Sequence, residues 1–143
     1  MSLIFGASEF KDPALGMLRR KGGKWRGKIA IDGNELPLVL DGSRNEPDVR
    51  ALETARTLPT RLTAWQPSIE RALFEHHEPY ADESPFSFAQ PADVWPHTTI
   101  QYLHVGAATI EIGLSVAWDE EHTLGARFTG DELVELNGSV LAT

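Results

Sequence analysis

The clearest pattern in the chain is a strict two-residue alternation of apolar side chains in its C-terminal third. The apolar positions are Ile110, Ile112, Leu114, Val116 and Trp118. Successive side chains of an extended chain point to opposite faces, so these five residues share one face of a strand. A helix would spread the same residues around its axis. This segment therefore predicts a β-strand with one buried face.

Three more segments of the C-terminal third alternate in the same way. Strands are predicted over residues 97–105, 124–128 and 133–140. Gly106-Ala107 and Thr129-Gly130-Asp131 are expected to form turns, and the polar residues 119–122 precede the strand over 124–128. Together with the segment that begins at Ile110, these strands give a predicted set of four antiparallel strands.

A second set of alternating segments lies near the N-terminus. Strands are predicted over residues 15–20, 25–31 and 35–40. Asp32-Gly33, between the last two, suits the positive φ angles of a tight hairpin. Residues 14–42 are therefore expected to form a three-stranded meander.

Residues 47–78 change to a spacing of three and four residues, which is typical of a helix with one buried face. Pro59 interrupts this pattern, and Pro67 suits the first turn of a second helix. Two helices, or one helix with a break, are therefore predicted. Residues 79–96 hold four prolines among aromatic residues, which predicts an irregular connection that packs on the core.

These elements predict a single α+β domain over residues 1–143. Two antiparallel β meanders, with about three strands in the N-terminal part and four in the C-terminal part, are expected to flank a central helical pair. Residues 1–13 show no period and are interpreted as a loosely ordered lead-in. A chain of 143 residues is close to the common size of one domain with one core.

The formal net charge of −8, from 21 acidic and 13 basic side chains, argues against nucleic acid as a partner. Nucleic-acid binding depends on Lys and Arg side chains that neutralise phosphates. The acidic balance instead favours a basic protein partner, because complementary potentials speed encounter. The one basic run, residues 19–28, is interpreted as the charged flanks of a hairpin turn, and an anion-binding hairpin is the alternative.

The chain contains no cysteine, which excludes disulfides, thiolate metal sites and a cysteine nucleophile. Its first residues do not resemble a signal peptide, and no apolar stretch approaches the roughly 20 residues that span a bilayer. We therefore expect a cytoplasmic protein that does not bind a membrane. None of these patterns indicates an oligomeric state.

The densest polar cluster follows Trp118 and comprises Asp119, Glu120, Glu121 and His122. On a continuing strand Glu120 and His122 share the face of Trp118, and carboxylates and imidazoles are common ligands of divalent metals. His104, on the neighbouring predicted strand, is the candidate for a third ligand. The alternative is a polar hairpin connection whose carboxylates bond to backbone amides.

His76 and His77 are neighbours in sequence, so on a helix they point about 100° apart and suit one metal ion poorly. We interpret His76 as the edge of the apolar helix face and His77 as solvent-exposed. The sequence contains no Gly-x-Ser-x-Gly motif and no phosphate-binding loop. No catalytic residue and no cofactor is therefore assigned.

The eight residues from Trp118 to Gly125 are Trp-Asp-Glu-Glu-His-Thr-Leu-Gly. This segment and the hairpin after it resemble a family of small bacterial domains of unknown function that carry Trp-Asp-x-Glu-His-x-x-Gly near the C-terminus. The early Trp-x-Gly pattern of that family is matched by Trp25-Arg26-Gly27. The resemblance implies that five residues act as a unit, which can be structural. They are Trp118, Asp119, Glu121, His122 and Gly125.

Two functions remain as hypotheses. The first is a non-catalytic protein-binding domain, for example an immunity-type protein that neutralises a basic toxin by covering its active site. The second is a metal-dependent hydrolase or metal-binding protein that uses Glu120, Glu121 and His122, with His104 as a further ligand. The acidic charge and the lack of a catalytic motif favour the first.

Overall fold

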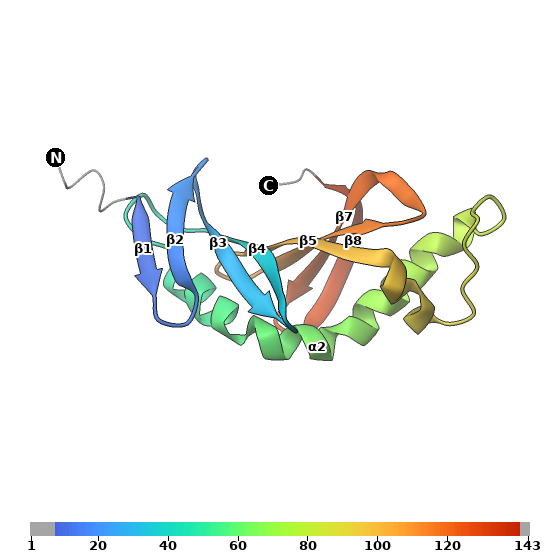
Figure 1. Cartoon of the computed structure of the whole chain (residues 1–143), viewed down its shortest axis with the longest axis horizontal. Helices are drawn as coiled ribbons and strands as arrows, with labels where there is room; N and C mark the ends of the chain where they lie inside the picture. Colours follow the sequence, from blue (N-terminus) through green and yellow to red (C-terminus); the bar gives the residue numbers. More distant parts are fainter. Residues whose placement is uncertain (1–7, 141–143) are drawn as a thin grey trace.

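The strands form one eight-stranded sheet in the computed structural model, which describes residues 8–140 (Figure 1). Their order across the sheet is their order along the chain. The strands are β1 (Glu9–Asp12), β2 (Gly16–Lys21), β3 (Lys24–Ile31), β4 (Asn34–Leu40), β5 (Thr98–Val105), β6 (Ile110–Val116), β7 (Asp119–Thr129) and β8 (Glu132–Val140). All neighbouring strands are antiparallel except β4 and β5, which run parallel.

One long helix, α2 (Val49–His77), lies along one face of this sheet (Figure 1). Its buried positions recur every three or four residues, so one side of the helix faces the sheet. These positions are Ala51, Leu52, Ala55, Leu58, Leu62, Trp65, Ile69, Leu73 and His77. The carboxylate of Asp48 caps the helix by accepting a hydrogen bond from the backbone N–H of Ala51 at 3.0 Å. The described chain thus has two layers, a sheet and a helix.

The prediction of a helical pair is wrong, because α2 continues through both Pro59 and Pro67. A proline in a helix cannot donate to the carbonyl four residues earlier, and its ring crowds that carbonyl. Both proline side chains are exposed, so the two rings lie on the solvent side of the helix, away from the packed face. Figure 1 shows the result: the helix is bowed, with its concave side toward the sheet.

The predicted fold class, two meanders that flank a helical pair, is also wrong. Leu38–Leu40 of β4 pair in parallel with Leu103–Val105 of β5, and this contact joins the two sets of strands into one sheet. The helix is the crossover between β4 and β5 and covers one face of the joined sheet. Alternation shows which face of a strand is buried, but it does not show which distant strand lies beside it.

Two short 3-10 helices, η1 (Glu78–Tyr80) and η2 (Pro91–His97), lie in the connection from α2 to β5. Val94 of η2 is fully buried, and Phe88 and Trp95 pack against the core. The connection therefore belongs to the folded body and extends the cover that α2 gives to the sheet.

The core lies between the helix and the sheet. Trp65 of α2 stacks on Phe128 of β7 with ring centroids 4.3 Å apart, and its indole N–H donates to Asp131 at 3.0 Å. Trp25 of β3 is fully buried and donates to the carbonyl of Ser43 at 2.9 Å. One continuous cluster of buried side chains includes both tryptophans, so the two halves of the sheet share a core.

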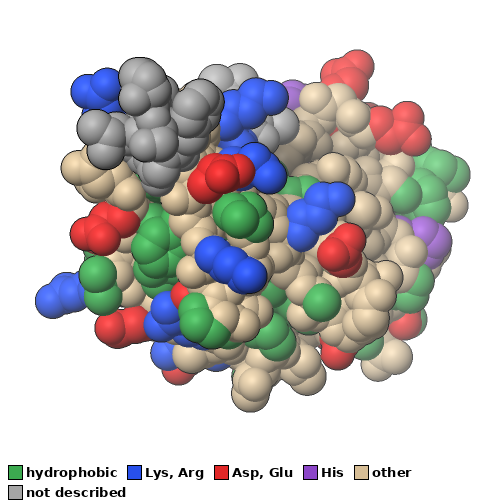
Figure 2. Space-filling view, turned by 60° about the vertical axis from the view of Figure 1, so that its left-hand side comes forward, with side chains coloured by type: hydrophobic (Ala, Val, Ile, Leu, Met, Phe, Trp, Pro, Cys, Tyr) green, Lys and Arg blue, Asp and Glu red, His purple; other side chains and the backbone are tan. Residues whose placement is uncertain are grey.

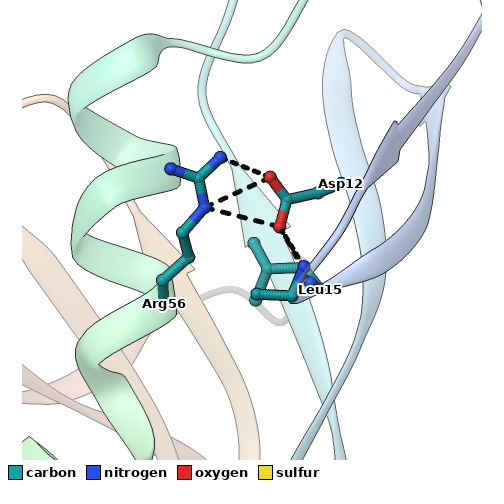
Figure 3. Close-up of polar contacts among 4 residues, drawn as sticks. Asp12, Leu15 and Arg56 are labelled. Atoms are coloured by element: carbon teal, nitrogen blue, oxygen red, sulfur yellow. Dashed lines mark hydrogen bonds and ion pairs between the residues drawn. The ribbon is translucent and has the colours of Figure 1, made fainter.

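Strand β1 lies within the segment assigned above to a loosely ordered lead-in, whose first seven residues are outside the described residues. Asp12, the last residue of β1, is buried although it is charged. It accepts hydrogen bonds from the backbone N–H groups of Ala14 and Leu15, both at 2.9 Å, and from the guanidinium of Arg56 in α2 (Figure 3). These contacts tie the edge of the sheet to the helix.

Candidate functional site

The predicted polar cluster lies where β6 turns into β7. Val116 pairs with Asp119, which leaves Ala117 and Trp118 as the turn. The next three residues of β7 are Glu120, Glu121 and His122, and all three are exposed. The ring of His122 bonds through Nδ1 to Oδ1 of Asp119 at 2.9 Å. The turn therefore presents carboxylates to solvent and holds one imidazole in place.

Trp118 anchors this turn to the C-terminal end of α2. Its indole N–H donates to Nδ1 of His76 at 3.1 Å. Its ring also packs edge-on against His77, at a centroid distance of 5.2 Å, and against Phe88 at 5.4 Å. The first residue of the predicted motif thus links three segments that are far apart in sequence.

These contacts belong to a larger group of rings, which we call the aromatic–histidine cluster. Its members are His76, His77, Tyr80, Phe86, Phe88, His97 and Trp118. Neighbouring centroids in the cluster are between 4.7 and 6.2 Å apart. Tyr80 is 49% exposed, and Phe86, Phe88 and Trp118 are half-buried. The cluster therefore combines partly exposed aromatic rings with a buried imidazole, that of His77.

The interpretation of His77 as solvent-exposed is wrong, because its side chain is only 4% exposed. The buried face of α2 continues from Ile69 and Leu73 in steps of four residues, and the next step is His77 rather than His76. No hydrogen-bond partner for Nε2 of His77 is found among the described residues. Its ring is instead enclosed by Phe88 and Trp118.

The protonation of His76 is coupled to the same cluster. Burial lowers the pKa of His76, Asp119 opposes that shift, and the imidazoles of His77 and His122 add to it. A neutral imidazole has one ring nitrogen with a free lone pair, which is what the N–H of Trp118 requires. The contact between Trp118 and His76 therefore favours the neutral ring.

Charge is distributed very unevenly along the chain, a signal that the net charge alone does not show. Of the 13 basic side chains only Arg71 and Arg127 come after residue 61, whereas 13 of the 21 acidic ones do. Because the strands lie in chain order, this asymmetry becomes spatial. Figure 2, which brings the β1 end forward, shows Lys and Arg side chains spread over that end of the molecule, interspersed with Asp and Glu side chains.

The aromatic–histidine cluster lies within the acidic part of the chain. Residues 72–126 contain no Lys and no Arg. The segments that supply the cluster also carry six exposed carboxylates, which we call the acidic rim. The rim consists of Glu75, Glu78, Asp82, Glu83, Glu120 and Glu121. The partly exposed rings and these carboxylates therefore come from the same segments of the chain.

The structure does not bring His104, the candidate third metal ligand, to Glu120 and His122. His104 bonds to Oδ1 of Asp41 at 2.8 Å, and Lys24 bonds to the same oxygen at 2.6 Å. His104 pairs with Glu111, which pairs with Arg127, so His122 lies five residues along β7 from that row, about 16 Å away. Among residues 8–140, no three His, Asp or Glu side chains are grouped so that they could hold a metal ion.

Gly125, the last residue of the predicted motif, has a packing role in the sheet. It pairs with Gly113 of β6, and a Cβ added to Gly125 would lie 2.9 Å from Cγ1 of Val140 and 3.1 Å from Oε2 of Glu111. The space beside Gly113 is filled by Tyr102, whose hydroxyl donates to Glu111 at 2.7 Å. These contacts lie on β5 to β8, away from the turn that carries Trp118.

Comparison with protein families places residues 14–140 in a family described as a domain of unknown function (DUF6985), and the chain belongs to this family. The expectation of a family of unknown function is therefore confirmed. No curated protein and no solved structure matched the chain. None of the helices in the described part of the chain has the length and apolar character needed to cross a bilayer.

Proposed function

We propose that this protein is a non-catalytic protein-binding domain that captures a basic partner through the aromatic–histidine cluster and the acidic rim. The observation that carries the proposal is the coincidence of half-buried aromatic rings with a segment of the chain that lacks Lys and Arg. We further propose that it acts in the cytoplasm, consistent with a cysteine-free chain.

The physical basis is that aromatic and charged side chains contribute differently to protein interfaces. A few aromatic side chains supply most of the binding free energy when they become desolvated, and Tyr80, Phe86 and Trp118 are placed to do so. Charged groups around them mainly set the association rate and the choice of partner. The acidic rim would attract a basic surface and repel an acidic one.

An immunity-type protein is the specific form of this proposal. Such a protein neutralises a toxin by covering its active site, which requires a rigid surface rather than a reactive one. The packing of Trp118 between α2 and the 86–88 segment supports rigidity at this surface.

The metal-dependent alternative keeps Glu120 and His122 as its strongest pair, since both lie just after the same turn. It has less support, because His122 is already bonded to Asp119 and His104 to Asp41. Calorimetry with Zn²⁺ and Mn²⁺ tests it directly: stoichiometric binding that is lost in His122→Ala would favour this alternative.

Site-specific photo-crosslinking in cells of the source organism tests the protein-binding proposal. A photoreactive amino acid at Tyr80 should trap one stoichiometric partner with a basic isoelectric point. The same amino acid at Lys28, on β3 in the basic half of the sheet, is the matched control and should trap little of it. Glu121→Lys should weaken the complex, and raising the salt concentration should slow its formation.

Two results would count against the proposal: the absence of a stoichiometric partner at Tyr80, or a partner whose binding is lost in Lys28→Glu but unchanged in Glu121→Lys. Expression of the trapped partner by itself tests the immunity hypothesis. A partner that is toxic alone and harmless together with this protein supports the immunity role.

A further inference from the structure

The parallel contact between β4 and β5 covers only part of either strand. Leu38–Leu40 pair with Leu103–Val105, whereas residues 34–37 of β4 pair only with β3 and residues 98–100 of β5 only with β6 among the described strands. Figure 1 shows the two strands diverging from this contact. A groove of about 440 Å³ lies between them, and we call it the β4–β5 groove.

The divergence follows from Pro37. The hairpin turn with positive φ at Asp32 and Gly33 makes Ile31 and Asn34 a hydrogen-bonded pair, so Glu35 and Pro37 direct their main-chain groups away from β3. To extend its pairing with β5, β4 would need an N–H at residue 37, and proline has none. A register shift between Ile100 and Tyr102 disrupts β5 at the same level.

The edge of β5 that faces the groove is able to accept another strand. The carbonyl of His97 bonds to the N–H of Ala117 on β6 at 3.0 Å. Main-chain groups alternate in direction along a strand, so those of Thr99 also face β6 and those of Ile100 face the groove. No described strand pairs with Ile100 on that side. An extended peptide could therefore bond to both its N–H and its C=O.

The groove also offers apolar contacts and a defined charge. Leu36, Trp95 and Ile100 are half-buried at its walls, and Leu62 of α2 lies beneath them. Its charged lining residues are Asp32 and Glu35, and its lining contains no Lys or Arg. Both carboxylates are exposed and have no ion-pair partner in the described part of the chain. The complementary ligand carries apolar and basic side chains.

We propose that the β4–β5 groove binds an extended segment of a partner protein as an added strand on the edge of β5. The segment places an apolar side chain against Leu36 and Trp95 and a Lys or Arg side chain near Glu35. The lining of the groove includes no member of the aromatic–histidine cluster, so this site goes beyond the function proposed above and stands without it.

A phage-displayed library of random heptapeptides, selected on the full chain, tests this inference. Selected peptides should combine apolar with Lys or Arg residues and contain no central proline. Titration of the best peptide into ¹⁵N-labelled protein should shift the Ile100 amide and the Trp95 indole resonance and slow hydrogen exchange at Ile100. N-methylation of one central peptide amide should weaken binding about tenfold, since it removes a main-chain hydrogen bond worth about 1.4 kcal/mol.

Matched variants separate this groove from the acidic rim. Glu35 and Glu121 are both exposed carboxylates on strands, so neither reversal of charge is expected to unfold the protein. Glu35→Lys should weaken the selected peptide about tenfold, whereas Glu121→Lys should leave its affinity unchanged. Circular dichroism of both variants checks that the fold is retained.

Three outcomes would overturn the inference. They are a library that yields no binder, a peptide that shifts resonances at Trp118 and not at Ile100, and equal binding of N-methylated and unmodified peptides. A dimer that forms without peptide and protects Ile100 would identify a second copy of the chain as the occupant instead. None of these results bears on crosslinking at Tyr80, so the two proposals can fail separately.

Discussion

The carboxylate of Asp12 is only 1% exposed, and it is held by the guanidinium of Arg56, a residue 44 positions further along the chain. The hydrogen bond from Arg56 lowers the pKa of Asp12, desolvation opposes this shift, and the N–H groups of Leu15 and Ala14 add to the lowering. A carboxyl whose pKa is lower in the folded state stabilises the fold above its unfolded pKa. That stability is lost as the pH falls through the folded pKa.

Asp12→Asn should therefore weaken the dependence of the unfolding free energy on pH under acidic conditions. The wild-type protein should lose more unfolding free energy than the variant between pH 5 and pH 2. Asp12→Ala at pH 7 should cost about 1–3 kcal/mol, because two backbone N–H groups lose their acceptor. Urea titrations at several pH values measure both effects, and parallel curves for wild type and Asp12→Asn would contradict this account.

Gly113 leaves no space for a side chain. A Cβ at this position would lie 2.0 Å from Cε2 of Tyr102, a ring in the buried interior. Gly113→Ala should destabilise the protein by about 1–3 kcal/mol, since the ring must move. Gly138→Ala on β8 is the matched control, because nothing lies within 4 Å of its added Cβ. Thermal unfolding compares the two, and the cost at Gly113 should shrink in a Tyr102→Val background.

The contact between Trp118 and His76 should make the cluster sensitive to mild acid. The pKa of His76 is lower in the folded state, mainly because of burial, so the unfolded state binds the proton more readily. Stability should consequently fall as the pH decreases from about 7 through the unfolded pKa near 6.5. His76→Gln retains an acceptor without titrating and should remove part of this dependence. Unfolding monitored by tryptophan fluorescence between pH 7.5 and pH 5 provides the measurement.

The residues of the motif after Trp118 should differ sharply in their effect on stability. The contact of Asp119 with His122 is partly exposed to solvent, so Asp119→Asn should cost less than about 1 kcal/mol. Trp118→Ala removes ring packing and a hydrogen bond to α2 and should cost about 2 kcal/mol or more. Equal costs for both variants, measured by urea unfolding, would show that the motif acts as one structural unit.

Local patterns predicted the strands well and their assembly poorly. The predicted strands overlap β2 to β8, because alternation of apolar side chains depends only on one buried face. The joining of Leu38–Leu40 to Leu103–Val105 has no local signature, since it depends on where the crossover helix returns the chain. Strand β1 was missed for a related reason: four residues are too few to show a period.

The helix shows how tertiary packing overrides a local signal. Pro59 and Pro67 each predicted a boundary, yet the buried positions continue in phase past both of them. A helix that buries nine side chains against a sheet gains more from packing than it loses at two prolines on its solvent side.

The density of polar residues after Trp118 predicted a polar connection, and the structure has a turn there, whose role stays a prediction. The aromatic–histidine cluster could not be predicted, because it joins the end of α2 to residues 86–88 and 118, which meet only in the folded chain. The absence of Lys and Arg over residues 72–126 was readable from the sequence and would have indicated the acidic surface.

The sheet whose strand order follows the chain has a consequence for folding kinetics. Hairpins between consecutive strands can close early, since each joins residues that are close in sequence. The short parallel pairing between β4 and β5 is expected to form later, because α2 and the connection from α2 to β5 separate the two strands in the chain. Closing so long a loop costs entropy before any contact repays it. We therefore expect the formation of these three residue pairs to limit the rate at which the protein reaches its native state.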